Sequence, residues 1–237
     1  MADAASVLVL TRPEAQSQSF LDAVCAGLKR NADAIISPVL RIEPVSFDVR
    51  LEDYRTIIVT SQNALPAAGS RLKGLQVRTV GAGTAVAAQR LGADAMSLGK
   101  DVDDLLKRSD EIEGPVIHLR GTHTRGDLVK RLRQAGIIAE GCVVYDQVAQ
   151  QLTPEAQAAL ANGSAIVPVF SPRSAALVSA HIVHEGTLVI AISETTAAEW
   201  NAPGQIRVAN RPDLQAMLVL THTALSADHL VAPPPRR

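Results

Sequence analysis

Arginines and glycines come together in one short stretch of the chain, and residues of these types are suited to binding anions. The stretch is L-R-G-T-H-T-R-G-D at 119–127. Arg120 and Arg125 offer fork-shaped guanidinium donors for carboxylates, and Gly121 lets the backbone turn tightly. A helix that begins after such a turn points its unpaired N–H groups back at it. The stretch therefore predicts one edge of an anion-binding pocket.

Five further turns have a similar composition, and each is expected to open a helix. They begin at Thr11, Ser61, Gly81, Ser171 and Ser193. Six helix N-termini facing one ligand would present on the order of three positive charges. The alternative is that the Ser and Thr residues are ordinary N-caps and that the arginines are solvated surface. The candidate ligand-binding residues are Arg12, Ser61, Asn63, Gly81, Gly83, Thr84, Arg120, Gly121, Arg125, Ser171, Arg173, Ser174, Thr195 and Thr196.

Short apolar runs precede these turns, and helix-spaced apolar residues follow them. The runs lie at 7–10, 56–60, 77–80, 116–119, 165–170 and 187–192. Phe20, Val24 and Leu28 form the inner face of the helix expected after the first turn. Strands that alternate with helices predict an α/β protein with parallel sheets, whose ligands bind at the carboxyl ends of the strands.

The strand and turn phrases recur at an offset of about 110 residues, which is close to a domain length. Ser61 aligns with Ser171, and the first strand and helix have their counterpart at 116–133. The repeat predicts two similar flavodoxin-like domains joined by a two-strand linker, with the active site in the cleft between them. The predicted ranges are 1–38 with 150–225 for one domain, 43–144 for the other, 39–42 and 145–149 for the linker strands, and 226–237 for a disordered tail.

The composition excludes several classes of function. A formal net charge of −1 and 3% aromatic residues give little attraction for nucleic acid. Cys25 and Cys142 are isolated, which suits a reducing compartment. The start, M-A-D-A-A-S, predicts no signal peptide, and no run is long enough to span a membrane. A cytoplasmic monomer is expected.

Other possible motifs lack the residues that their chemistry needs. His181 and His184 have helical spacing, but no Cys or carboxylate stands beside them at metal-ligand spacing, so no metal site is predicted. Gly81 and Gly83 lack the third glycine of a dinucleotide fingerprint, and 121–126 lacks the Gly-Lys-Ser/Thr of a P-loop. The acidic run at 101–104 indicates a helix start.

Seven motifs in order resemble the uroporphyrinogen-III synthase family, over the chain up to about Leu225. They are V-L-V-L-T-R-P at 7–13, T-S-Q-N-A at 60–64, V-G-A-G-T-A at 80–85, L-R-G-x-x-x-R-x-x-L at 119–128, V-Y-D-Q at 144–147, F-S-P-R-S-A at 170–175 and T-T-A at 195–197. The chain departs from the family pattern at 193–197, where Ser-Glu-Thr-Thr-Ala replaces Gly-x-x-Thr-Ala. The carboxylate of Glu194 would repel an anionic substrate.

The resemblance implies a cofactor-free cyclisation in tetrapyrrole biosynthesis. Hydroxymethylbilane loses its terminal hydroxyl as water, and the last ring is inverted before closure to uroporphyrinogen III. The substrate would come from hydroxymethylbilane synthase. The substrate's pyrroles supply the electrons, so positioning dominates the enzyme's contribution. The alternative from another class is a non-catalytic two-domain binding protein for a small polyanionic ligand.

The resemblance also points to Tyr145 as the proton donor. Strand alternation predicts that Val144 packs inward while the phenol of Tyr145 projects towards the gap between the domains. A phenol with a pKa of about 10 is protonated at neutral pH and can donate a hydrogen bond to a departing hydroxyl. The alternative is that Tyr145 fills the crossover between the domains.

Overall fold

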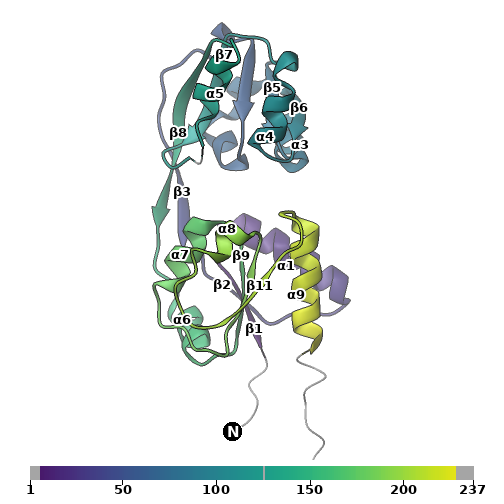
Figure 1. Cartoon of the computed structure of the whole chain (residues 1–237), viewed down its shortest axis with the longest axis vertical. Coiled ribbons are helices and arrows are strands. Elements are labelled where there is room, and N and C mark those ends of the chain that lie inside the picture. Colours follow the sequence, from purple (N-terminus) through teal and green to yellow (C-terminus); the bar gives the residue numbers. More distant parts are fainter. Residues whose placement is uncertain (1–5, 125, 228–237) are drawn as a thin grey trace, which may run out of the picture. The chain divides into compact units, whose positions relative to one another are not determined.

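The structure, a computed structural model, describes residues 6–124 and 126–227. Arg125 and the predicted tail beyond residue 227 lie outside the described residues. The described chain divides into two compact units, with residues 6–41 and 149–227 in unit 1 and Ile42–Val148 in unit 2. Each unit has a sheet flanked by helices (Figure 1). The predicted α/β class is confirmed.

The sheet of unit 1 has the strand order β11-β10-β9-β1-β2, and all its pairs are parallel. Counted along the unit, this is the flavodoxin-like order 2-1-3-4-5. The elements are β1 (Val7–Leu10), α1 (Glu14–Leu28), β2 (Ala34–Ile36), α6 (Pro154–Ala161), β9 (Ala165–Val169), α7 (Pro172–Ser179), β10 (Leu188–Ala191), α8 (Glu194–Ala197), β11 (Gln205–Val208) and α9 (Leu214–Ala227).

Two features of unit 1 differ from the prediction. Helix α6 was not predicted, although Thr153 caps it through a hydrogen bond from Ala156 N (3.3 Å) and Pro154 opens it. Proline suits this first position because the N–H that it lacks would have no helical partner. Helix α9 continues through Ala227, so residues 226 and 227 are helical, contrary to the predicted disordered tail at 226–237.

The sheet of unit 2 has the order β3-β8-β7-β4-β5-β6. The elements are β3 (Leu40–Pro44), η1 (Leu51–Asp53), β4 (Thr56–Val59), η2 (Gln62–Ala64), α2 (Leu65–Ala68), η3 (Gly69–Leu72), β5 (Gln76–Val80), α3 (Ala82–Arg90), β6 (Asp94–Gly99), α4 (Val102–Lys107), η4 (Ser109–Glu111), β7 (Val116–Gly121), α5 (Leu128–Gln134) and β8 (Ala139–Ala149).

Strand β3 is an exception to the predicted parallel sheets. Val45 N donates to Val144 O, and Gln150 N donates to Val39 O, both at 2.9 Å, so the residue numbers run in opposite directions. Strand β3 therefore pairs with β8 in the antiparallel sense. The unit boundaries fall within these two strands. They run antiparallel because one carries the chain into unit 2 and the other carries it out.

The five parallel strands of each unit correspond position by position across the sheet, but they follow one another along the chain in a different order. Without β3, unit 2 has the order 3-2-1-4-5, which differs from the flavodoxin-like order predicted for both domains. The reason is that β7, α5 and β8 end unit 2, whereas their counterparts β1, α1 and β2 begin unit 1. The strand order reverses between β1 and β9 in unit 1, and between β7 and β4 in unit 2. In such sheets, ligands bind beside these switch points.

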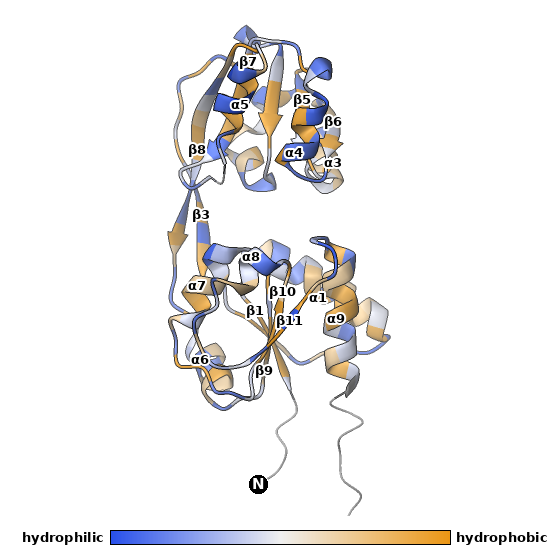
Figure 2. Ribbon diagram, in the orientation of Figure 1, coloured by the Kyte–Doolittle hydropathy of each residue, from blue (hydrophilic) through white to orange (hydrophobic). Residues whose placement is uncertain are grey.

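Apolar side chains cover both faces of each sheet. In unit 1, α6 and α7 pack on one face and α1 and α9 on the other. In unit 2, α2 and α3 pack on the face that includes Ile117 and Leu119, whereas α4 and α5 pack on the face that includes Val116. Figure 2 shows hydrophobic residues concentrated on the central strands. These two-sided cores explain why the parallel strands are short continuous apolar runs.

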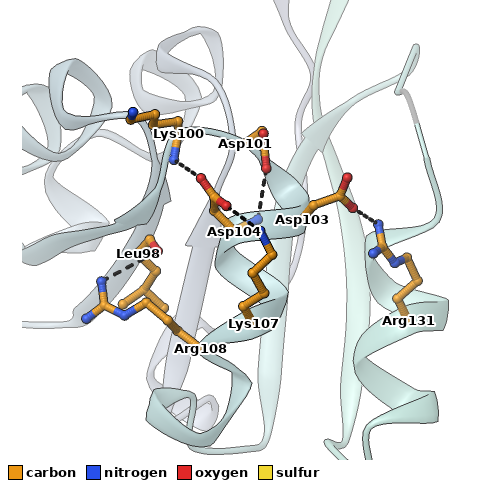
Figure 3. Close-up of polar contacts among 8 residues, drawn as sticks. All are labelled: Leu98, Lys100, Asp101, Asp103, Asp104, Lys107, Arg108 and Arg131. Carbon is orange, nitrogen blue, oxygen red and sulfur yellow. Dashed lines mark hydrogen bonds and ion pairs between the residues drawn. The ribbon is translucent and has the colours of Figure 1, made fainter.

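The acidic run at 101–104 forms the start of α4, as predicted (Figure 3). Asp101 is the N-cap, and its side chain accepts a hydrogen bond from Asp104 N at 2.8 Å. Asp104 pairs with Lys107 at 2.9 Å, and Asp103 pairs with Arg131 of α5 at 2.7 Å. The carboxylates thus cap one helix and link it to its neighbour.

Candidate functional site

The switch point of unit 2 holds Tyr145. Its hydroxyl interacts with the side chain of Ser61, which follows β4, and with the backbone of Gly121, which ends β7. Burial raises the pKa of Tyr145, and these two interactions oppose that rise. The phenol is therefore protonated at neutral pH and can act as a hydrogen-bond donor.

The side chain of Tyr145 packs within unit 2, contrary to the predicted strand alternation. Val144 and Tyr145 are neighbours in the sequence, yet both belong to one buried cluster, with Tyr145 6% exposed. The pairing of β7 with β8 shifts here, because Arg120 pairs with Val143 whereas Gly121 pairs with Tyr145. Two residues of β8 thus oppose a single step of β7, as in a β-bulge, and the alternation breaks.

Gly121 lies against this phenol. A Cβ atom at Gly121 would be 2.7 Å from ring atoms of Tyr145 and 3.0 Å from its hydroxyl oxygen. Arg120 and Gly121 are the last residues of β7, and Gly121 does not have a positive φ. The prediction that Gly121 permits a tight turn is therefore wrong. Glycine is needed at this position because the tyrosine ring approaches so closely.

Arg120 lies on the other face of the sheet. Ile117 and Leu119 of the same strand belong to the cluster that contains Tyr145. Because residues alternate between the two faces along β7, Arg120 points to the face opposite to theirs. Arg120 instead lines a cavity of about 670 Å³ beside α5, together with His118. The basic stretch therefore contributes to two places in unit 2 rather than to one pocket edge.

His118 is buried in β7, two residues before Arg120. Its Nε2 shares a hydrogen bond of 3.1 Å with Thr60 Oγ1. Burial, assisted by the positive charge of Arg120, lowers the pKa of His118 to about 4. The imidazole is consequently neutral at pH 7, and the positive charge at this place comes from the arginine.

The depressed pKa of His118 predicts a loss of stability in acid. As the pH falls below about 6.5, the unfolded chain takes up this proton before the folded chain does. The free energy of unfolding should therefore fall by roughly 3 kcal/mol between about pH 6.5 and about pH 4. Denaturant titrations should show a weaker pH dependence for His118→Gln than for the wild type. His181→Gln is the control, and equal pH profiles for the wild type and His118→Gln would contradict the prediction.

The switch point of unit 1 holds Arg12. Its guanidinium carbon lies 4.3 Å from the ring centroid of Phe170, which follows β9. Phe170 in turn packs edge-on against Phe20, with their centroids 5.2 Å apart. Burial lowers the pKa of Arg12. Phe170 was not among the predicted site residues, although its place immediately before Ser171 in the F-S-P-R motif could have suggested it.

Thr11 presents an unusual polar group at the same switch point. It is 1% exposed, and within the described part of the chain its Oγ1 has no hydrogen-bond partner. Its backbone oxygen accepts a hydrogen bond from Val39 N at 3.1 Å. The turn after β1 is thus held in place by its backbone and by the cation–π contact of Arg12.

Three predicted serines act as helix N-caps, which was the alternative interpretation of the turns. The oxygen of Ser61 accepts from Asn63 N (3.3 Å), that of Ser171 from Ser174 N (3.1 Å), and that of Ser193 from Thr196 N (3.3 Å). The capped amides confirm that these turns open helices. Each serine hydroxyl accepts a hydrogen bond from the helix that it caps. Contacts with a ligand would therefore be made by neighbouring backbone N–H groups.

The remaining predicted residues lie around these caps. Thr84, Ser174 and Thr196 each occupy the third position after the cap residue of a helix and are buried. The predicted residues with other placements are Gly81, which caps α3 with φ 78°, Gly83 within α3, Asn63 in η2, Arg173 in α7, and Thr195, whose hydroxyl lies 2.9 Å from that of Ser193.

Within residues 6–124 and 126–227, no group of three or more His, Cys, Asp or Glu residues is arranged to hold a metal ion. None of the described helices has the length and apolar character that a membrane span requires. Cys25 and Cys142 are both free thiols.

The fold and site define an α/β protein whose sheets are mainly parallel and whose switch points carry turns that open helices. The chain belongs to the uroporphyrinogen-III synthase family, because residues 23–219 match the family described as "Uroporphyrinogen-III synthase HemD". No curated protein matches the chain in a sequence search.

Two solved structures share the fold. Uroporphyrinogen-III synthetase from Helicobacter pylori has a TM-score of 0.65 at 19% identity, covering 93% of this chain and 99% of that one. A mutant uroporphyrinogen III synthase from the extremely thermophilic bacterium Thermus thermophilus has a TM-score of 0.53 at 16% identity, covering 94% of this chain and 100% of that one.

Proposed function

We propose that this protein is a hydro-lyase that cyclises hydroxymethylbilane to uroporphyrinogen III, with loss of water and inversion of ring D. The product would serve tetrapyrrole synthesis, which includes haem, sirohaem, cobalamin and chlorophyll. Membership of the family supports this activity. The observation that carries it in the structure is the buried phenol of Tyr145 at a switch point, packed against Gly121 and beside Ser61. Family membership also disfavours the alternative of a non-catalytic binding protein.

The proposed reaction requires only one proton donor from the protein. The bond between the hydroxymethyl carbon and its oxygen breaks as electrons flow from the attached pyrrole. The hydroxyl of Tyr145 donates a proton to the departing oxygen, which leaves as water. The phenolate regains a proton that the substrate releases when its pyrrole becomes aromatic again. The protein's larger contribution is to hold a flexible octacarboxylate in a reactive shape, without a cofactor or a metal.

The predicted binding residues divide between the two units. We propose that the units are domains, that 39–42 and 145–149 act as linker strands, and that one substrate molecule contacts turns of both. Arg12, Arg120, Arg125 and Arg173 would contact carboxylates. Backbone N–H groups would serve at the turns that begin at Ser61, Gly81, Ser171 and Ser193, where Glu194 opposes anions. Helix N-termini favour such contacts.

The proposed activity is tested by product analysis. The full-length protein is incubated with hydroxymethylbilane generated by hydroxymethylbilane synthase, and the type I and type III isomers are separated after oxidation. We expect the type III isomer to dominate, whereas spontaneous closure without the protein gives type I. A product ratio equal to that of the protein-free reaction would reject the proposed function.

The domain proposal predicts that residues 42–148 fold alone. This segment contains two apolar clusters of its own. A fragment with this range is expected to show one cooperative transition in urea, because each face of its sheet retains its helices. Residues 1–41 alone are expected to remain unfolded and serve as the control. A gradual change without a transition in the 42–148 fragment would contradict the proposal.

We propose a cytoplasmic location, which the free thiols of Cys25 and Cys142 suit. We propose a monomer that receives its substrate from hydroxymethylbilane synthase, with no nucleic acid or membrane partner.

A further inference from the structure

A basic cavity lies in unit 2 on the sheet face opposite Tyr145. It has a volume of about 670 Å³ and is bounded by α5 and by residues of β7 and β8. Arg120, Lys130 and Arg133 bring three positive charges to its lining, against the single carboxylate of Asp127. His118 also lines it but is neutral at pH 7, because its pKa is lowered to about 4. The lining therefore favours anions.

Gly141 of β8 gives Arg120 its place in this cavity. A Cβ atom at Gly141 would lie 3.1 Å from Arg120 Nε and 3.5 Å from Val129 Cγ2. The guanidinium thus lies over β8 and beside α5. Arg120 Nη1 also donates to Gly121 O at 3.1 Å, which holds the group near the end of β7. Arg120 is therefore directed to the cavity by packing and by this hydrogen bond.

The other cations are on α5. Arg133 Nε donates to Ala139 O at 2.6 Å, which uses one of the five N–H donors of the guanidinium and orients its plane. Lys130 is exposed and carries three rotatable donors. The lining also includes apolar side chains, Leu128 and Val129. A suitable ligand would be a small apolar ring with more than one carboxylate.

We propose that this cavity binds one carboxylated pyrrole ring of the linear tetrapyrrole. The identity of this ligand rests on the proposed function. The cavity and the phenol of Tyr145 belong to opposite faces of the sheet, so the bound ring would be one at which no bond changes. Lys130 and Arg133 then act as positioning residues for the substrate.

The test is a titration of the isotopically labelled full-length protein with porphobilinogen, a pyrrole that carries one acetate and one propionate side chain. The NMR signals of the backbone amides of Val129 and Gly141 are expected to shift. Lys130→Gln is expected to raise the dissociation constant about fivefold. Arg131→Gln is the matched control, because it removes the same charge from the same helix. Arg131 pairs with Asp103 at 2.7 Å (Figure 3) and is not part of the cavity lining.

Three results would overturn the proposal: no shift at Val129 and Gly141, equal weakening by both variants, or displacement of the pyrrole by inorganic phosphate at equal concentration. With hydroxymethylbilane as substrate, Lys130→Gln should raise KM by a similar factor and leave kcat nearly unchanged. The titration does not depend on turnover. A wild-type protein that binds the pyrrole but forms no type III isomer would therefore refute the proposed function and not the cavity assignment.

Discussion

Replacing Tyr145 with phenylalanine is expected to lower the turnover number by roughly 10² to 10⁴, the range typical of a lost general acid. The substitution keeps the ring and removes only the hydroxyl, which contacts Ser61 and Gly121. Packing in the surrounding cluster should change little, so the melting temperature should stay close to that of the wild type. Steady-state formation of the type III isomer gives the turnover number.

The matched control is Tyr54→Phe, which removes the hydroxyl of the other tyrosine. That hydroxyl donates to Glu140 Oε1 at 2.8 Å and has no part in the proposed reaction. Tyr54→Phe should therefore leave turnover nearly unchanged. If Tyr145→Phe reduced turnover by less than about tenfold, water or the substrate would be the proton source, and positioning would account for most of the catalysis.

Replacing Gly121 with alanine is expected to damage both stability and turnover. The new Cβ would lie 2.7 Å from ring atoms of Tyr145, so the phenol must move. That ring is packed in the core, with 6% exposed, and overpacking of this kind costs about 1 to 3 kcal/mol of unfolding free energy. Because the hydroxyl moves with the ring, turnover should fall towards that of Tyr145→Phe. Denaturant unfolding and steady-state kinetics measure the two effects.

The double variant separates a displaced phenol from general damage. If Gly121→Ala acts through Tyr145, adding Tyr145→Phe should lower turnover far less than it does in the wild type, since residues that act as a unit are not additive. Full additivity of the two losses would show that Gly121→Ala acts by another route. Wild-type turnover in a destabilised Gly121→Ala would show that the position of the phenol is unimportant.

The local elements could be predicted from the order of residues alone. Strand β1 has the predicted bounds, and the serines at 61, 171 and 193 cap helices as the alternative interpretation of the turns required. These features depend on signals within a few residues, namely apolar runs and the hydrogen bond that a nearby amide N–H donates to a cap oxygen. The offset repeat also predicted that β1 and β7 are counterparts, and these strands hold equivalent places in the two sheets.

The arrangement of the candidate site, in contrast, depends on the packed fold. The contact of Tyr145 with Ser61 and Gly121 joins three separate parts of the chain. The register shift beside Gly121 directs the consecutive side chains of Val144 and Tyr145 into the same buried cluster. The contact of Arg12 with Phe170 likewise depends on the pairing of β1 with β9. No local pattern specifies these contacts, because strand pairing and close packing depend on residues that are distant in sequence. The sequence singled out Arg12, Ser61, Gly121 and Tyr145 as candidates, whereas the direction of each side chain and its neighbours, such as Phe170, could not be predicted.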